Sequence, residues 1–341
     1  MGSNYGVHSG HFEVAVLDWF ARNLELPKDQ CWGYVTNGGT EVNSHGLLVG
    51  TELFPEGILY ASQDSHYSIF KISKMYIVKC IKIDMTASGE MDYDDFRSKL
   101  LKNTMSPGIV NVNIGTTMEG AIDDVDKIIA TFQYCGFDER FYIHCDGALA
   151  ELIIPFVEQA IGSISVSFHK FIGCPMPCGA VMSRLKDVNR LQTTYMDYIS
   201  SKNTTISGSR NGHAPIYLWY ILNSIGYNGI CREVEICLKN AQHLKYSLEK
   251  IRVSVFLNTL STAVVFERPK DEAFVRKWQL SCEGNIAHVV VMPHVTIEKL
   301  NKFFEEFALL RGKEFSVPCV TTDIGPENCV CVLHEDKGCQ E

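Results

Sequence analysis

Up to residue 167, the chain alternates between short apolar runs and longer runs whose apolar positions repeat at helical spacing. Short runs rich in β-branched residues are typical of buried strands, and helical spacing is typical of amphipathic helices. The strand-like and helix-like runs follow one another at residues 32–36, 41–54, 58–61, 65–74, 77–83, 93–101, 109–114, 124–132, 141–145 and 163–167. This order predicts an α/β fold with an open, mostly parallel sheet, covered by helices on both faces, whose ligands bind at the carboxyl ends of the strands.

The flanking segments complete the predicted domain organisation. Residues 11–26 and 230–250 carry apolar side chains at helical spacing, and strand-like runs at 262–266 and 286–292 each lead to a helix-like segment. The end of the chain is polar and interrupted by proline and glycine, which is typical of a poorly ordered tail. The pattern divides the chain into a large domain at 1–228, a smaller C-terminal α/β domain at 229–311 and a tail at 312–341.

Composition narrows the class of function. The 341 residues are 46% hydrophobic, enough for a sizeable core, and the net charge of -9 argues against a surface for nucleic acid or anionic membranes. Small-molecule chemistry is therefore the better expectation. The thirteen cysteines have no paired small-domain spacing, and the N-terminus has no secretory hydrophobic segment. Together these features predict a cytoplasmic protein.

The strand-like run at 163–167 leads directly into a turn rich in glycine and proline. This turn carries His169 and Lys170. A lysine amine that is desolvated among small residues loses its proton more readily and can form a Schiff base with an aldehyde cofactor. The alternative is an ordinary solvated lysine, so the interpretation of Lys170 depends on the polar residues that follow the other strands.

The glycine-rich stretch at 36–41 follows one predicted strand and opens a helix. Its two glycines allow the backbone to approach an anion closely, the Thr40 hydroxyl can donate a hydrogen bond, and the helix N-terminus adds a positive dipole end. These features favour a phosphate site that includes Gly39, with a tight turn capped by threonine as the alternative. The stretch matches neither a Walker loop nor a dinucleotide fingerprint, so neither ATP nor NAD is indicated.

Three further polar residues follow predicted strands. His66 could stack on an aromatic cofactor, or it could be a helix cap. Thr117 could contact a phenolic oxygen, or it could belong to an ordinary helix N-terminus. Asp146 ends an apolar strand, where a carboxylate needs a cationic or hydrogen-bonded partner; a protonated pyridine nitrogen, a metal ion and a helix N-terminus are the candidates.

Cysteines recur near the end of the chain. The residues that could form a zinc site there are Cys329, Cys331, His334 and Cys339. Their short spacings within a predicted tail favour ordinary thiols instead. We therefore expect no metal ion.

Seven short strings occur in a characteristic order: GGTE, SHYS, NIGTT, HCDGA, S-x-HKF-x-GCPMPCG, GSRNGH and HVVVMP. Taken together, they resemble the pyridoxal-phosphate enzymes of the aspartate-aminotransferase fold (fold type I). More narrowly, they are similar to the group II amino-acid decarboxylases, in particular the plant serine decarboxylases and histidine-decarboxylase-like proteins. The resemblance extends from Asn4 to about Leu309. It implies that 1–228 is a domain that binds pyridoxal 5′-phosphate (PLP), and that the enzyme is a dimer.

The resemblance also implies a role for each candidate residue. Lys170 would form the Schiff base, His66 would stack on the ring, Asp146 would pair with the pyridinium nitrogen, and Thr117 would lie near the phenolic oxygen. A tyrosine on a loop reprotonates the product in this family, and Tyr198 is the candidate here. The phosphate would be bound by Gly39, Thr40, Ser167 and His169.

The implied activity is decarboxylation of an amino acid, with L-serine giving ethanolamine as the first choice of substrate and L-histidine giving histamine as the second. The sequence also departs from the family pattern. The N-terminal region of the family and a short segment before Ile161 are absent, and Phe168 and Val42 replace glycines. These departures support an alternative of another class, a shortened and catalytically impaired paralogue that acts only as the partner of a full-length subunit.

Overall fold

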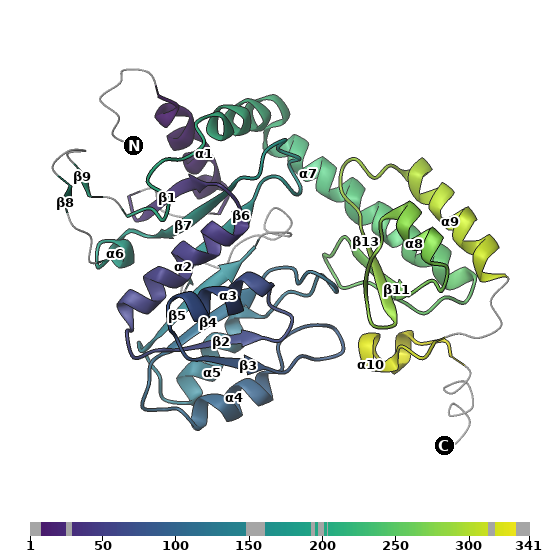
Figure 1. The fold of residues 1–341 in the computed structure, drawn as a ribbon, viewed down its shortest axis with the longest axis horizontal. Helices are drawn as coiled ribbons and strands as arrows, with labels where there is room; N and C mark the ends of the chain where they lie inside the picture. The colour runs from purple at the N-terminus through teal and green to yellow at the C-terminus, as the bar shows by residue number, and fades with distance from the viewer. Residues whose placement is uncertain are drawn as a thin grey trace. The chain divides into compact units, whose positions relative to one another are not determined.

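The computed structural model describes residues 8–24, 29–147, 161–191, 195–196, 201–202, 204–312 and 318–331 (Figure 1). The chain forms two compact units. The first comprises the described residues of Met1–Asp84, Met91–Gly115 and Ile122–Gly229, and the second comprises those of Met85–Glu90, Thr116–Ala121 and Ile230–Glu341. The division expected from the sequence assigned the loops at 85–90 and 116–121 to the large domain and treated 312–341 as a separate tail. In the structure, these loops and the described residues after 311 belong to the second unit.

The helices and strands of the first unit alternate along the chain as the hydrophobic pattern predicts. The helices are α1 (Gly10–Asn23), α2 (Gly39–Leu53), α3 (Tyr67–Met75), α4 (Tyr93–Leu101), α5 (Val125–Tyr134), α6 (Leu185–Val188) and α7 (His213–Lys250), which continues into the second unit. The strands are β1 (Cys31–Thr36), β2 (Ile58–Ser62), β3 (Cys80–Ile83), β4 (Gly108–Asn113), β5 (Phe141–Asp146), β6 (Ile161–Ser167), β7 (Gly179–Arg184), β8 (Tyr195–Met196) and β9 (Ser201–Lys202). The long helix α7 is kinked at Gly226, whose φ of 66° is in the region that favours glycine.

Seven of these strands form one sheet in the order β1-β7-β6-β5-β4-β2-β3. Strands β2 to β6 pair in parallel with their neighbours, whereas β7 is antiparallel to both β6 and β1. The prediction of a mostly parallel α/β sheet is therefore confirmed. Strand β7 was not predicted, because it follows the turn after β6 without an intervening helix.

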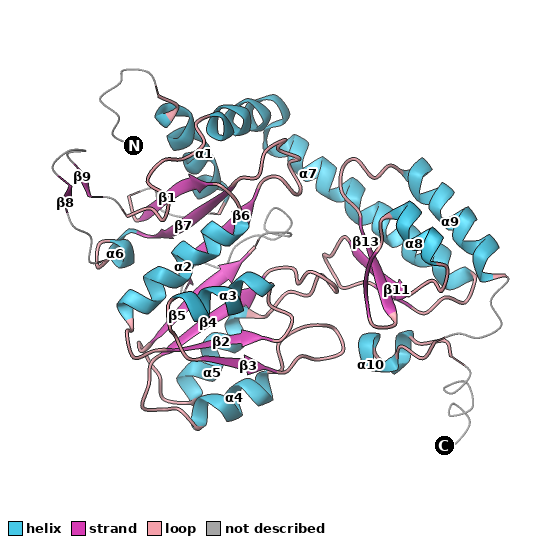
Figure 2. Ribbon diagram, viewed as in Figure 1, coloured by secondary structure: helices cyan, strands magenta, loops and turns pink. Residues whose placement is uncertain are grey.

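Helices cover both faces of this sheet (Figure 2). On one face, apolar residues of α1, α4 and α5 pack on the strands; these include Ala21, Phe96, Leu100, Ile128 and Phe132. On the other face, α2, α3 and α6 contribute Leu47, Val49, Ile69, Ile72 and Val188. A strand buried on both faces is apolar along most of its length, and for this reason the short apolar runs of the sequence predict the strands well.

The second unit contains a smaller antiparallel sheet in the order β10-β11-β13-β12. Its elements after α7 are β10 (Val255–Phe256), β11 (Ala263–Glu267), α8 (Glu272–Trp278), β12 (Ser281–Glu283), β13 (Ile286–Val290), α9 (Ile297–Arg311), α10 (Thr321–Ile324) and the 3-10 helix η2 (Pro326–Asn328). Aromatic rings join the sheet to α8 and α9: the ring centroid of Phe303 lies 5.8 Å from that of Phe266 and 5.6 Å from that of Phe274.

The segment at 318–331 differs from the poorly ordered tail that the sequence suggested. Val320 and Ile324 of this segment are fully buried, and they pack with Val265 and Ile286 of the second sheet. The apolar residues of this segment lie on one side of a short helical turn. Such a turn is too short to show the repeating apolar spacing by which a helix is recognised in a sequence. Across the described residues, no helix has both the length and the apolar character needed to cross a membrane.

Candidate active site

The ends of four neighbouring strands bring the candidate residues of the first unit to one edge of the sheet. Asp146 at the end of β5 lies opposite Ser165 of β6, and Ser167 at the end of β6 lies opposite Gly179 of β7. Gly179 is in turn opposite Thr36, the last residue of β1. The glycine-rich stretch after β1 therefore lies at the same edge of the sheet as the turn that carries Lys170.

Asp146 is a buried carboxylate, with a side chain that is 6% exposed. Its Oδ2 accepts a hydrogen bond of 2.7 Å from Asn43 Nδ2, and its Oδ1 accepts one of 3.2 Å from Ser165 Oγ. A buried carboxylate is tolerated only when it is hydrogen-bonded or paired with a cation. These two donors hold Asp146 in one orientation at the edge where a ligand of such a sheet binds.

Asn43 links Asp146 to the candidate stacking residue His66. The Asn43 amide group also donates to Ser68 Oγ at 3.2 Å, and Ser68 Oγ lies 2.7 Å from His66 Nδ1. His66 is the N-cap of α3, and its Nδ1 accepts a hydrogen bond of 3.4 Å from the Ser68 backbone N–H, which places the imidazole proton on Nε2. Burial lowers the pKa of His66, an effect that Asp146 opposes and Lys170 reinforces, so His66 is neutral and close to both charged groups.

The other end of Asn43 contacts a second buried histidine. Asn43 Oδ1 lies 3.1 Å from His144 Nε2, and His144 Nδ1 lies 2.8 Å from Ser163 Oγ, which accepts a hydrogen bond from Tyr142. Burial lowers the pKa of His144 to about 4, and the neighbouring Asp146 only partly offsets this. His144 is therefore neutral and donates from Nε2 to Asn43, which fixes the orientation of the Asn43 amide.

The glycine-rich stretch forms an uncapped N-terminus for α2. Gly38 precedes the helix with φ 144° and ψ 175° and provides no side-chain cap. A Cβ at Gly39 would lie 2.9 Å from Ser167 Oγ, so a larger residue there would require the Ser167 side chain to shift. The first amide groups of a helix lack internal acceptors, and beside the Thr40 and Ser167 hydroxyls they form a site suited to a phosphate group.

Lys170 lies half-buried in the turn that follows β6, with its backbone N–H 3.3 Å from the Ser167 carbonyl oxygen. His169 is held by a hydrogen bond of 3.0 Å from Nδ1 to the Cys178 carbonyl oxygen, which leaves Nε2 for another partner. Phe168 packs against Phe20 of α1 with ring centroids 4.8 Å apart. Because side chains alternate between the faces of a strand, Phe168 lies on the α1 face and Ser167 on the α2 face.

The comparisons with known proteins agree with this geometry. The pyridoxal-dependent decarboxylase conserved domain matches residues 11–268. The chain belongs to the pyridoxal-dependent decarboxylase family. It is 64% identical to serine decarboxylase 3 of Oryza sativa subsp. japonica, over 99% of this chain and 77% of that protein. It is 48% identical to histidine decarboxylase of Solanum lycopersicum, over 95% of this chain and 82% of that protein.

Solved structures of decarboxylases share the fold. L-methionine decarboxylase from Streptomyces sp. 590 superimposes with a TM-score of 0.80 at 22% identity, covering 91% of this chain and 85% of that chain. Mouse CSAD superimposes with a TM-score of 0.73 at 19% identity, covering 89% and 76%. The decarboxylase is therefore a PLP-dependent carboxy-lyase with an α/β fold of type I, as the resemblance implied.

The donor set of this decarboxylase fits PLP, which carries an aldehyde, a pyridine nitrogen and a phosphate. Lys170 carries a primary amine of the kind that condenses with an aldehyde, and Asp146 is a buried carboxylate suited to a protonated ring nitrogen. The backbone at Gly39 approaches Ser167 Oγ closely, which suits a phosphate site at the start of α2. His66 interacts electrostatically both with Asp146, which acts to raise its pKa, and with Lys170, which acts to lower it.

Two candidate residues are not among the contacts described for this group. Thr117 is exposed and belongs to the loop at 116–121, which is part of the second compact unit, while its neighbour Thr116 is buried and accepts a hydrogen bond from Ala121 N–H. Tyr198 lies outside the described residues.

Sequence reasoning missed Asn43, which contacts Asp146 directly. The signal was a polar residue within the apolar face of a predicted helix, two positions after Glu41. It also left Arg210 without a role. In the structure, Arg210 forms a buried ion pair of 2.8 Å with Glu13, whose carboxylate also accepts from Val35 N–H.

Proposed function

We propose that this chain decarboxylates L-serine to ethanolamine and carbon dioxide with PLP as cofactor. The observation that carries the choice of substrate is the similarity to three serine decarboxylases of Oryza sativa subsp. japonica, at 57–64% identity over 98–99% of this chain. L-Histidine is the second candidate, supported by the histidine decarboxylase of Solanum lycopersicum at 48% identity.

When bound, PLP supplies an aldehyde for the substrate amine and a conjugated ring that accepts the electron pair left when carbon dioxide departs. The residues proposed to hold it are Lys170 at the aldehyde and Asp146 at the ring nitrogen. Gly39, Thr40, Ser167 and His169 are proposed for the phosphate, and Thr117 for the phenolic oxygen.

Asp146 acts by holding a proton on the ring nitrogen. An ionised carboxylate favours the protonated form of a nearby base, and the effect is strongest where water is excluded. Asn43 and Ser165 keep both carboxylate oxygens in place, so no reorganisation is needed as charge shifts during the reaction.

His66 presents a neutral imidazole with its proton on Nε2. Because Ser68 fixes Nδ1, the ring has one orientation and can lie flat against an aromatic ligand. The lowered pKa of His66 keeps this residue from adding a positive charge beside Lys170. Lys170 would hold the aldehyde of the cofactor through its amine, and Tyr198 is proposed as the residue that would supply a proton to the substrate carbon.

We further propose that the enzyme acts in the cytoplasm as a homodimer or as a dimer with a full-length paralogue. The contrasting hypothesis is that the chain is a catalytically impaired partner subunit, and one reason for it was the presence of Phe168 beside Lys170. In the structure the Phe168 ring packs on Phe20 of α1, which argues against the idea that this ring obstructs the cofactor.

The experiment is an assay of carbon dioxide release by the purified chain with a panel of amino acids, with and without PLP. Serine turnover that depends on PLP supports the proposal. Preferred turnover of L-histidine would identify histidine as the substrate and leave the proposed reaction unchanged. Absence of turnover by the chain alone, with activity recovered on mixing with a full-length relative, would support the partner-subunit hypothesis instead.

A further inference from the structure

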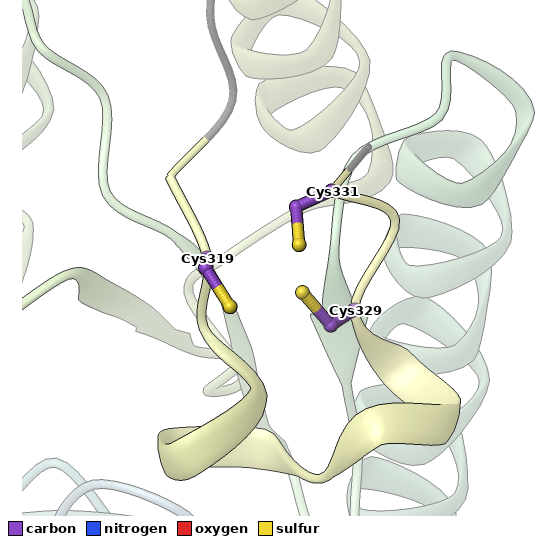
Figure 3. A group of neighbouring side chains, drawn as sticks. All are labelled: Cys319, Cys329 and Cys331. Carbon is purple, nitrogen blue, oxygen red and sulfur yellow. The ribbon is translucent and has the colours of Figure 1, made fainter. Parts of the chain in front are cut away.

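Three cysteine side chains of the second unit gather in the segment that follows α9. The Sγ atoms of Cys319, Cys329 and Cys331 all lie within 4.8 Å of one another. Figure 3 shows the three sulfur atoms pointing toward a common centre, with α10 and η2 forming the turn that returns the chain to Cys319. The turn therefore brings the three thiols of a Cys-x9-Cys-x-Cys pattern close together.

The cluster has a buried side and an open side. Cys329 and Cys331 are 8% and 2% exposed and belong to the apolar cluster with Val265 and Ile286, whereas Cys319 reaches the solvent. An ion could enter from the Cys319 side, and it would then be shielded by the apolar residues on the other side.

Hydrogen-bond donors lie beside the buried part of the cluster. The Cys329 sulfur is hydrogen-bonded by Thr321 and by the backbone N–H groups of Val320 and Cys331. Backbone N–H groups directed at a sulfur are the type of support that metal-bound thiolates receive.

We propose that Cys319, Cys329 and Cys331 bind a zinc ion, with a water molecule as the fourth ligand. Zinc binds thiolates at about 2.3 Å in tetrahedral geometry, which places the sulfurs about 3.8 Å apart, so a small closure of the cluster is sufficient. On binding, the thiols that still carry protons release them to solvent, and three S–Zn bonds form. No redox change is involved.

The zinc ion would hold the start and the end of the segment at 319–331 together and act as a structural clip within it. This role is separate from the proposed decarboxylation and does not depend on it. From the sequence we expected ordinary thiols and no metal ion, after weighing a set of Cys329, Cys331, His334 and Cys339, so the proposal departs from that expectation. His334 and Cys339 lie outside the described residues and are not part of the proposed site. Cys319, ten positions before Cys329, is the ligand that the spacing did not reveal.

The test uses the PLP-loaded protein after removal of metals with a chelator. Cd²⁺ is added as a spectroscopic substitute, and the ultraviolet charge-transfer band of cadmium-bound thiolates is titrated. We expect saturation at one Cd²⁺ per chain and displacement by Zn²⁺. Cys319→Ser, which changes an exposed side chain and leaves the buried pair intact, should weaken the affinity at least about tenfold and reduce the band by about a third. Cys282→Ser in β12 is the matched control and should change neither.

A second measurement does not depend on the fold of the variants. Alkylation of the wild-type protein, followed by mass spectrometry, should show that Zn²⁺ protects the three proposed ligands and leaves Cys282 unprotected. A band that persists unchanged in Cys319→Ser, or equal alkylation with and without Zn²⁺, would overturn the proposal. A disulfide between two of the three cysteines in the protein as purified under reducing conditions would overturn it as well.

Discussion

Asn43 Nδ2 donates a hydrogen bond of 2.7 Å to Asp146 Oδ2, and through this contact a residue of α2 orients the carboxylate at the end of β5. The same side chain contacts Ser68 and His144, so three elements are connected through one amide. Each of its polar atoms has a partner, which leaves the amide a single orientation. Asn43 is therefore a positioning residue for the proposed cofactor site.

Asn43→Ala should lower kcat for decarboxylation by about 10- to 100-fold, since loss of a hydrogen bond to a buried charged group costs about 1.5–3 kcal/mol. The pH profile should change as well, because the ring nitrogen of the cofactor would retain its proton less firmly. The measurement is carbon dioxide release as a function of pH. Asn223→Ala, on the exposed face of α7, is the control. An unchanged kcat and pH profile would remove Asn43 from the site.

Gly39→Ala should weaken PLP binding about tenfold, because the new Cβ would lie 2.9 Å from Ser167 Oγ and overpacking costs about 1–3 kcal/mol. The measurement is the Kd for PLP by absorbance titration. Ser167→Ala removes the obstructing hydroxyl, and its own effect on PLP binding is measured separately because Ser167 is a proposed phosphate ligand. If Gly39→Ala weakens PLP binding as much in the Ser167→Ala background as in the wild-type protein, the steric explanation is wrong.

Much of the fold follows from the sequence because its strands are buried on both faces and its helices are amphipathic. The runs at 93–101 and 58–61 match α4 and β2 to within a residue. Strand β7 could not be predicted in this way, since its place between β1 and β6 depends on long-range pairing. Asp146 was found from its position at a strand end, whereas Asn43 and Cys319 act only through partners that are distant in the sequence.

Arg210→Met should lower the free energy of unfolding by about 3–5 kcal/mol, because it leaves Glu13 as a buried charge without its cation. Both side chains are 8% exposed. The measurement is the urea-induced unfolding midpoint. Arg97→Ala breaks an exposed ion pair with Asp94 and should change the free energy by no more than about 0.5 kcal/mol. Equal effects of the two variants would contradict the structural role of Arg210.

Acidification should destabilise the enzyme between about pH 6.5 and pH 4. His144 and His45 are buried, and burial lowers the pKa of each to about 4. As the pH falls through this window, the unfolded chain binds protons at these histidines that the folded chain does not, so stability decreases. His144→Gln should reduce the pH dependence of the unfolding midpoint, whereas His11→Gln, an exposed control, should leave it unchanged. The same slope in both variants would argue against a neutral buried His144.

The most direct test of the central claim is to reconstitute the protein with PLP, reduce it with borohydride and map the modified lysine, alongside carbon dioxide release from serine. The account predicts one adduct at Lys170, with loss of both the adduct and the activity in Lys170→Ala. An adduct at another lysine, or PLP-dependent serine turnover that survives Lys170→Ala, would contradict it.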